Sequence, residues 1–143
     1  MREASLDLAL PAEPASVPLV RRAVARQLRA WALSDLVDCV ILAASELATN
    51  AVLHARGSLR VTLERTGPGE VRLEVTDGSS RLPLQRRHSQ LAGTGRGLQL
   101  VGALAEEWGV EVLAGRGKVV WAVFLGGAAG VPSQDSQGGL ADL

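Results

Sequence analysis

Three polar side chains recur every four residues within one otherwise apolar stretch. In ELATNAVLHA, residues 46–55, they are Glu46, Asn50 and His54. Residues four apart lie on the same side of a helix, so the carboxylate, the amide and the imidazole are expected to form one stripe. A metal site is one interpretation, but the stretch has no HExxH motif or paired histidine and therefore lacks a zinc ligand set. An amphipathic helix with a solvated polar edge would show the same stripe.

A further candidate is Asp77, which ends the predicted strand VRLEVTD. It falls on the same side as Val71, Leu73 and Val75, which is the core side of an alternating strand. A carboxylate is costly to bury there unless a donor hydrogen-bonds to it. Asp77 could therefore receive a donor group of a buried ligand, such as an exocyclic amine. Asp-Gly is also an ordinary strand end, in which the carboxylate caps the following turn.

Alternating glycines at 93, 95 and 97 stand at the start of a predicted helix, in GTGRGLQLV. Glycine costs roughly 1 kcal/mol relative to alanine in a helix interior, so the pattern indicates that backbone must lie close to something. Exposed amide N–H groups at a helix N-terminus form a ready phosphate site. The Rossmann fingerprint fails because Leu98 stands where a glycine is needed, and no Gly-Lys ends a P-loop. A flexible hinge would also explain the glycines.

Helices and strands must position these groups, and hydrophobic periodicity predicts where they lie. The expected elements are a strand at 6–10, helices at 17–32 and 34–55, strands at 59–63 and 71–76, a helix at 96–107, and strands at 110–114 and 119–125. Ser34 is expected to be the N-cap of the second helix, with Asp35 and Asp38 near the positive end of its dipole.

The strands at 59–63 and 71–76 alternate apolar and polar residues, which predicts a hairpin with one polar face. Such a sheet is covered by helices on one side only, whereas strands of a doubly wound parallel sheet read as continuous apolar runs. The sequence therefore predicts an α/β two-layer sandwich, with a mixed, mostly antiparallel sheet covered on one face by about three helices.

Composition limits the class of protein. The 143 residues are 47% hydrophobic, enough for one domain with a single core. We expect a strand and linker at 1–14, the folded domain at 15–125 and a disordered tail at 126–143. Fifteen acidic and fifteen basic residues give no net charge, so neither nucleic acid nor a membrane surface is an expected partner. Cys39 is the only cysteine, so no internal disulfide can form. We expect neither a signal peptide nor a membrane span, and we therefore expect the chain to be cytoplasmic.

Together the motifs resemble GHKL-type ATPases with the Bergerat nucleotide-binding fold. The resemblance is specifically to the small stand-alone anti-sigma-factor serine/threonine kinases and their actinobacterial relatives. ELATNAVLHA matches the first motif through Glu46, Asn50 and His54, and VTDG matches the second through Asp77. GTGRGLQLV matches the third, and WGVEVLAGRGKVVWAVFL matches the closing hairpin. The resemblance covers roughly residues 15 to 125.

The resemblance implies a role for each matching residue, with ATP and Mg as cofactors. Glu46 would be the general base on the attacking hydroxyl, and Asn50 would help coordinate magnesium. Asp77 would accept a hydrogen bond from the adenine amino group, and the glycine run would approach the phosphates through backbone amides, with Arg96 adding charge. The residues implied in nucleotide contact are Asn50, His54, Asp77, Gly78, Gly93, Thr94, Gly95, Arg96, Gly97 and Leu98.

Residues 78–94 would form the lid over ATP, ordering around nucleotide and opening for exchange. The basic cluster at 86–88 in this lid could attract phosphate, although such clusters are more often solvated loops. The chain departs from the family pattern at three places. Ser79 and Gln99 stand where glycines are usual, and Val119 and Val120 follow Lys118 where the closing hairpin often has a threonine.

Two functions follow as the main hypotheses. The first is an ATP- and Mg-dependent regulatory serine/threonine kinase of anti-sigma-factor type, acting on a sigma factor or an anti-anti-sigma partner. The second is a nucleotide-sensing protein-binding module with little turnover, which the departures at Ser79 and Gln99 favour. The catalytic fragment of a sensor histidine kinase is a third, weaker hypothesis. Relatives often form homodimers through the sheet edge or first helix, and Val17 to Trp31 offers apolar surface for such contact.

Overall fold

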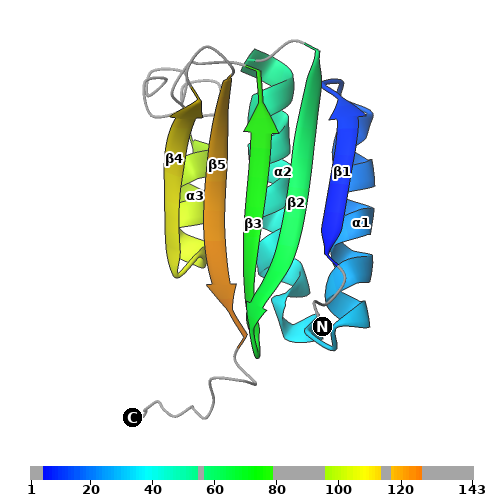
Figure 1. The fold of residues 1–143 in the computed structure, drawn as a ribbon, viewed down its shortest axis with the longest axis vertical. Helices are drawn as coiled ribbons and strands as arrows, with labels where there is room; N and C mark the ends of the chain where they lie inside the picture. The colour runs from blue at the N-terminus through cyan, green and yellow to red at the C-terminus, as the bar shows by residue number, and fades with distance from the viewer. Residues whose placement is uncertain (1–4, 55–56, 79–95, 114–116, 127–143) are drawn as a thin grey trace.

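The computed structural model describes residues 5–54, 57–78, 96–113 and 117–126. They form two layers, a five-stranded sheet and a layer of helices on one of its faces (Figure 1). The elements are β1 (Leu6–Pro11), α1 (Ser16–Ala30), the 3-10 turn η1 (Ser34–Leu36), α2 (Val37–His54), β2 (Ser58–Gly67), β3 (Glu70–Asp77), α3 (Arg96–Leu104), β4 (Glu107–Leu113) and β5 (Gly117–Leu125). The predicted two-layer sandwich is confirmed.

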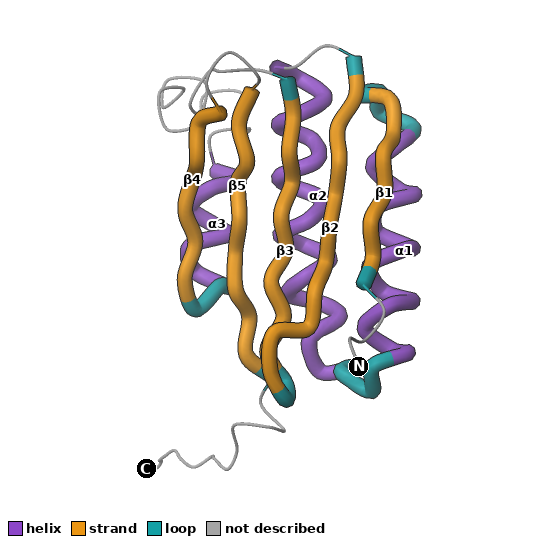
Figure 2. Tube along the Cα trace, in the orientation of Figure 1, coloured by secondary structure: helices purple, strands orange, loops and turns teal. Residues whose placement is uncertain are grey.

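The sheet has the strand order β1-β2-β3-β5-β4, so the last strand of the chain lies between β3 and β4 (Figure 2). Each pairing between these described strands is antiparallel, so the sheet expected to be mixed and mostly antiparallel is antiparallel throughout this part. Every second residue of β3 is buried, as the sequence alternation requires for a sheet with one covered face. The predicted hairpin of β2 and β3 is confirmed.

The core fills the space between the sheet and α1 and α2. Val20, Val24 and Leu28 recur every four residues on α1 and are fully buried, as expected for the apolar stripe of an amphipathic helix. The buried residues of α2 include four fully buried alanines, Ala43, Ala44, Ala48 and Ala51. Small side chains allow the backbone of α2 to approach its neighbours closely, and α2 packs against α1, α3 and β3.

The predicted helix cap at Ser34 is wrong. Ser34 begins the 3-10 turn η1 instead, and the α-helix begins at Val37. The residue before η1 is Leu33, and it makes no side-chain capping hydrogen bond. Leu33 and Leu36 are both buried, so burial of these two side chains determines the path of the connection more than capping does.

The third helix ends earlier than the sequence predicts, at Leu104 instead of near Glu107. The backbone N–H of Glu106 already donates to the carbonyl of Val123 at 2.7 Å. Pairing with β5 therefore captures this segment, and Glu107 becomes the first residue of β4.

In the described ranges η1 and α2 form one continuous helical stretch, Ser34–His54, that is long and apolar enough to cross a membrane by length and composition, contrary to the expectation from the sequence. It is the middle helix of the layer and packs against α1, α3 and the sheet. A helix that is apolar around most of its circumference is typical of a protein core, so this single helix is weak evidence for a membrane span.

Cys39 lies half-buried on the first turn of α2, with its thiol donating to the carbonyl of Leu36 at 3.5 Å. Burial raises the pKa of this thiol above its usual value. We expect Cys39 to react with iodoacetamide at pH 8 more slowly in the folded protein than in urea, because only the thiolate is nucleophilic. The difference should narrow as pH rises through the raised pKa. Rates that are equal at every pH would contradict this placement.

Candidate functional site

Three of the elements that carry predicted site residues meet at one end of the sheet, together with the start of β5 (Figure 1). The C-terminal end of α2, the end of β3, the start of α3 and the start of β5 all lie there, at the upper end of the view. This follows from the antiparallel order, because β3 ends where the neighbouring β5 begins. The fold thus gathers segments that are far apart in the sequence.

A buried ion pair lies at this end of the sheet. The Nζ of Lys118 donates to both carboxylate oxygens of Asp77, at 3.0 Å to Oδ1 and 2.9 Å to Oδ2. The two side chains are only 5% and 4% exposed. Among the residues whose burial the structure describes, they are the only charged ones that are buried.

The register of the sheet creates this pair. Asp77 on β3 is directly opposite Lys118 on β5, and both project to the helix-covered face. The predicted core-side position of Asp77 is therefore confirmed. Sequence reasoning missed Lys118, although it occupies the same face of β5 as the buried Val120, Ala122 and Phe124. The sequence did offer a signal, because Lys118 occupies a position of this alternating strand at which an apolar core residue is expected.

Gly117 allows the main chain of β5 to come close to the end of β3. Its φ is +105°, a left-handed value that strains other residues, and a methyl group there would overlap the carbonyl oxygen of Asp77. The strand ends that carry Asp77 and Lys118 are thus held together by a position that requires glycine.

Gly117→Ala is therefore expected to lower the free energy of unfolding by at least about 2 kcal/mol, measured by urea denaturation. Gly57→Ala is the matched control. Gly57 also has a left-handed φ, of +91°, but a methyl group there would meet nothing within 4 Å. In Gly57→Ala only the backbone strain applies, and we expect the free energy of unfolding to fall by about 1 kcal/mol. Equal losses in the two variants would show that the contact with Asp77 contributes nothing.

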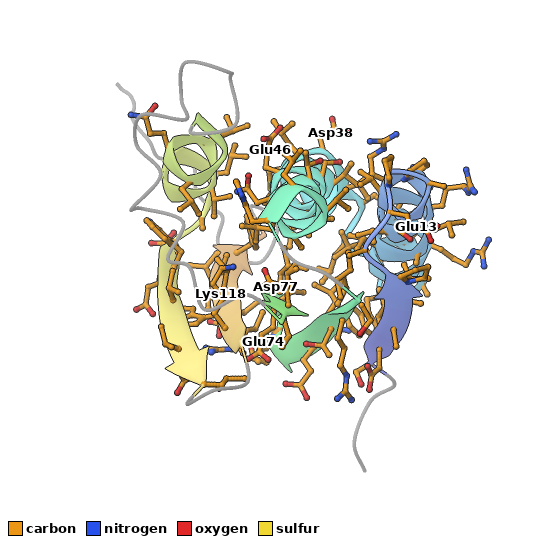
Figure 3. All side chains as sticks on the ribbon, turned by 90° about the horizontal axis from the view of Figure 1, so that it is seen from above. Glu13, Asp38, Glu46, Glu74, Asp77 and Lys118 are labelled. Atoms are coloured by element: carbon orange, nitrogen blue, oxygen red, sulfur yellow. The ribbon has the colours of Figure 1, made fainter. Side chains whose placement is uncertain are left out.

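The predicted stripe of Glu46, Asn50 and His54 lies on α2, and all three side chains are half-buried. Each step of four residues turns the stripe by about 40°, so Glu46 lies farthest from the buried face and His54 nearest to it. Figure 3 shows Glu46 on the side of α2 away from the sheet, while Asp77 and Lys118 lie between the helices and the sheet. The carboxylate of Glu46 therefore lies near the middle of α2 on its outer side, whereas that of Asp77 lies between the helices and the sheet.

The predicted phosphate segment is described only in part. Gly93, Thr94 and Gly95 lie outside the described residues, as do the basic residues at 86–88 and most of the predicted lid. Arg96 and Gly97 begin α3, as predicted, and the side chain of Leu98 is buried in the core. Gly78 is exposed and directly follows Asp77. The predicted tail at 126–143 is likewise described only at Gly126.

Magnesium was expected at Asn50. The described residues hold no group of three or more His, Cys, Asp or Glu side chains that could bind a metal ion. The amide of Asn50 is half-buried near the site end of α2. A hard ion that keeps several waters and takes further oxygens from phosphate needs few protein ligands, so the residues present fit magnesium bound together with a nucleotide.

Comparison with protein families gives a match over residues 10–124 to the histidine kinase-like ATPase domain. The chain belongs to this family. The match also confirms the resemblance to GHKL-type proteins that the motifs indicated. A comparison with curated proteins finds no match.

Among solved structures, this ATPase-family domain matches "the RsbU and RsbW domains of Rv1364c from Mycobacterium tuberculosis" with a TM-score of 0.62 and 22% sequence identity. The match covers 99% of this chain and 35% of that chain. At this identity the likeness shows the fold alone. The domain thus spans about a third of the neighbour, whose other parts have no counterpart in the match.

Proposed function

We propose that this domain is an ATP- and Mg-dependent regulatory serine/threonine kinase of anti-sigma-factor type. One observation carries the proposal. The carboxylate of Asp77 is buried on the helix-covered face of β3, at the same end of the sheet as the C-terminal end of α2 and the start of α3. Membership of an ATPase family and a structural neighbour with an RsbW domain support this assignment.

Each group has a distinct role in the proposed reaction. The carboxylate of Asp77 accepts a hydrogen bond from the exocyclic amine of adenine, which places the base between α2 and the sheet. Bound magnesium would neutralise phosphate charge, and the Asn50 amide would hold it together with the phosphates. Glu46 would take the proton from the attacking serine or threonine hydroxyl of the protein substrate. The position of Glu46 on the outer side of α2 suits a base that must reach a second protein.

The proposed substrate and partner is an anti-anti-sigma protein, with a sigma factor as the protein whose binding is regulated. A homodimer is the proposed assembly, because related domains often pair through the sheet edge or first helix. The proposed compartment is the cytoplasm.

A nucleotide-sensing protein-binding module is the second candidate, and the Asp77–Lys118 pair favours it. Both oxygens of the proposed adenine acceptor already interact with Lys118, and Ser79 and Gln99 alter the usual motif glycines. Such a domain would bind nucleotide weakly and act through protein contact alone.

Two measurements separate these functions. Isothermal titration calorimetry with ATP and MgCl₂ is expected to show binding below millimolar concentration, and absence of binding would overturn both candidates. Transfer of radiolabelled γ-phosphate to a serine of an anti-anti-sigma protein from the same organism then tests the kinase. Binding without transfer would favour the module.

A further inference from the structure

We propose that the face of the sheet opposite to the helices, here called the open face, binds a second copy of this chain, with β5 packed on β5 and β3 facing β4. The inference goes beyond the homodimer of the proposed function because it names a surface. This surface differs from the sheet edge and first helix through which related domains often pair. It requires neither ATP binding nor phosphate transfer, so its test is independent of theirs.

Apolar side chains follow β5 along the open face. Alternate residues of β5 are buried on the helix-covered face, so the residues between them project to the open face. These form the apolar stripe, which consists of Val119, Trp121, Val123 and Leu125. A sheet covered on one side normally has polar residues on the other, as β3 does, and Figure 3 shows Glu74 of β3 on the side away from the helices. The stripe departs from this rule along the whole strand.

Packing within the chain accounts for only part of the apolar stripe. The ring of Trp121 lies against the main chain of β4, because a methyl group at Gly109 would come within 2.7 Å of it. The guanidinium of Arg72 lies 4.5 Å from the centre of the same ring. Leu125, at the end of the stripe, is 49% exposed. Contiguous exposed apolar residues are typical of a protein–protein interface, where tryptophan and arginine are also enriched.

The register of the sheet places opposite charges on the two sides of the stripe. Val123 pairs with Val123's neighbours Arg72 on β3 and Glu107 on β4, so the three residues form one row across the open face. In the next row, Trp121 lies between Glu74 on β3 and Gly109 on β4. The first row therefore runs from a basic through an apolar to an acidic side chain.

A two-fold axis parallel to β5 turns this row into two complementary contacts. Such an axis, midway between two sheets packed face to face, places each row on the same row of the second copy and exchanges β3 with β4. Arg72 of each copy then faces Glu107 of the other. Glu74 faces Gly109, which carries no charge. Sheets packed in this way are about 10 Å apart, a gap that an arginine and a glutamate side chain can span together.

Both charged groups are available for this contact. Glu107 is exposed and forms no ion pair with another residue in the part of the chain that the structure describes. Arg72 is 34% exposed in its side chain and donates from Nε to Glu74 at 2.8 Å. The two terminal nitrogens of its guanidinium carry further donors for a second carboxylate.

The size of the patch sets the expected strength of the dimer. Three strands about 4.8 Å apart, over the seven residues of β4, cover roughly 14 by 23 Å. This area is smaller than one side of a standard stable interface. The dimer is therefore expected to be weak and to dissociate on dilution.

Sedimentation equilibrium of the full chain tests the inference. The wild type is expected to show a monomer–dimer equilibrium at about 100 µM. Arg72→Glu and Glu107→Arg each replace both opposite-charge contacts with like-charge contacts, so each variant alone should raise the dimer Kd at least about 10-fold. An equimolar mixture of the two variants restores both opposite-charge contacts in the heterodimer. The mixture should therefore associate about as tightly as the wild type.

Glu64→Arg is the matched control. Glu64 is exposed on the same face, but it belongs to β2, outside the three strands that meet, so its reversal should leave the Kd unchanged. If Arg72→Glu does not fold by circular dichroism, Val123→Asp carries the test. It places two carboxylates opposite each other across the axis and should abolish the dimer.

Three results would overturn the inference. The first is a wild type that remains monomeric at every concentration. The second is a dimer that neither Glu107→Arg nor Val123→Asp weakens, which would place the contact on another surface and leave the proposed homodimer intact. The third is weakening by both Arg72→Glu and Glu107→Arg without recovery in their mixture, which would indicate general damage to the fold.

Discussion

Replacing Asp77 with alanine is expected to lower the free energy of unfolding by about 3–5 kcal/mol, measured by urea denaturation followed by circular dichroism. The reason is the ammonium group that remains. Lys118 is only 5% exposed in its side chain, so without its partner it would stay buried as an uncompensated charge or distort the strand end to reach water. Most of the expected loss in the free energy of unfolding comes from the Lys118 ammonium, which stays buried without a counter-charge, and less comes from removal of the Asp77 carboxylate itself.

Two controls test this reason. The double variant Asp77→Leu with Lys118→Met removes both charges and should recover most of the lost stability, because no buried charge is left unpaired. Asp7→Ala breaks an ion pair to Arg60 of similar length, 2.7 Å, in which both side chains are more than half exposed. The unfolding midpoint should hardly change in that variant, because water replaces the lost partner. A small effect of Asp77→Ala alone would mean that Lys118 reaches solvent easily.

Glu46→Ala is expected to reduce phosphate transfer to the protein substrate at least about 100-fold, as is usual when a general base is removed. ATP affinity should stay near the wild-type value, because Glu46 lies on the outer side of α2 and away from Asp77. Single-turnover transfer of γ-phosphate measures the first effect, and calorimetry measures the second.

Asp38→Ala is the matched control for Glu46. It removes an acidic side chain from the same helix, but Asp38 is exposed in the first turn, at the end of α2 opposite to the site. Transfer by Asp38→Ala should equal that of the wild type. Glu46→Gln, which keeps the shape and removes the charge, should be as slow as Glu46→Ala. Normal transfer by Glu46→Gln would exclude Glu46 as the base and direct the search to another acceptor.

Local patterns predicted the parts of the fold that depend on neighbouring residues. Alternation in β2 and β3 defined their buried faces, and it correctly placed Asp77 on the core side. The start of α2 could not be predicted in this way, because burial of Leu33 and Leu36 outweighs the capping preference of Ser34. Local propensity is a weak guide where tertiary packing competes with it.

The candidate site was predictable only for residues that belong to motifs. The stripe on α2 follows from helical spacing, and the structure describes it on one helix. The pairing of Lys118 with Asp77 could not be found without the register, because the two residues are 41 positions apart and the pairing of β3 with β5 skips β4. A contact of this kind depends on strand order, which period-two alternation does not encode.

The position of β5 has a consequence for how the chain is made. Synthesis proceeds from the N-terminus, so β3 and β4 leave the ribosome before the strand that must lie between them. Until residue 118 emerges, the nascent domain carries an acid without its counter-ion and a gap in the middle of its sheet. Completion of the domain is therefore a late event, and a chain that stops before β5 should remain a substrate for chaperones and proteases.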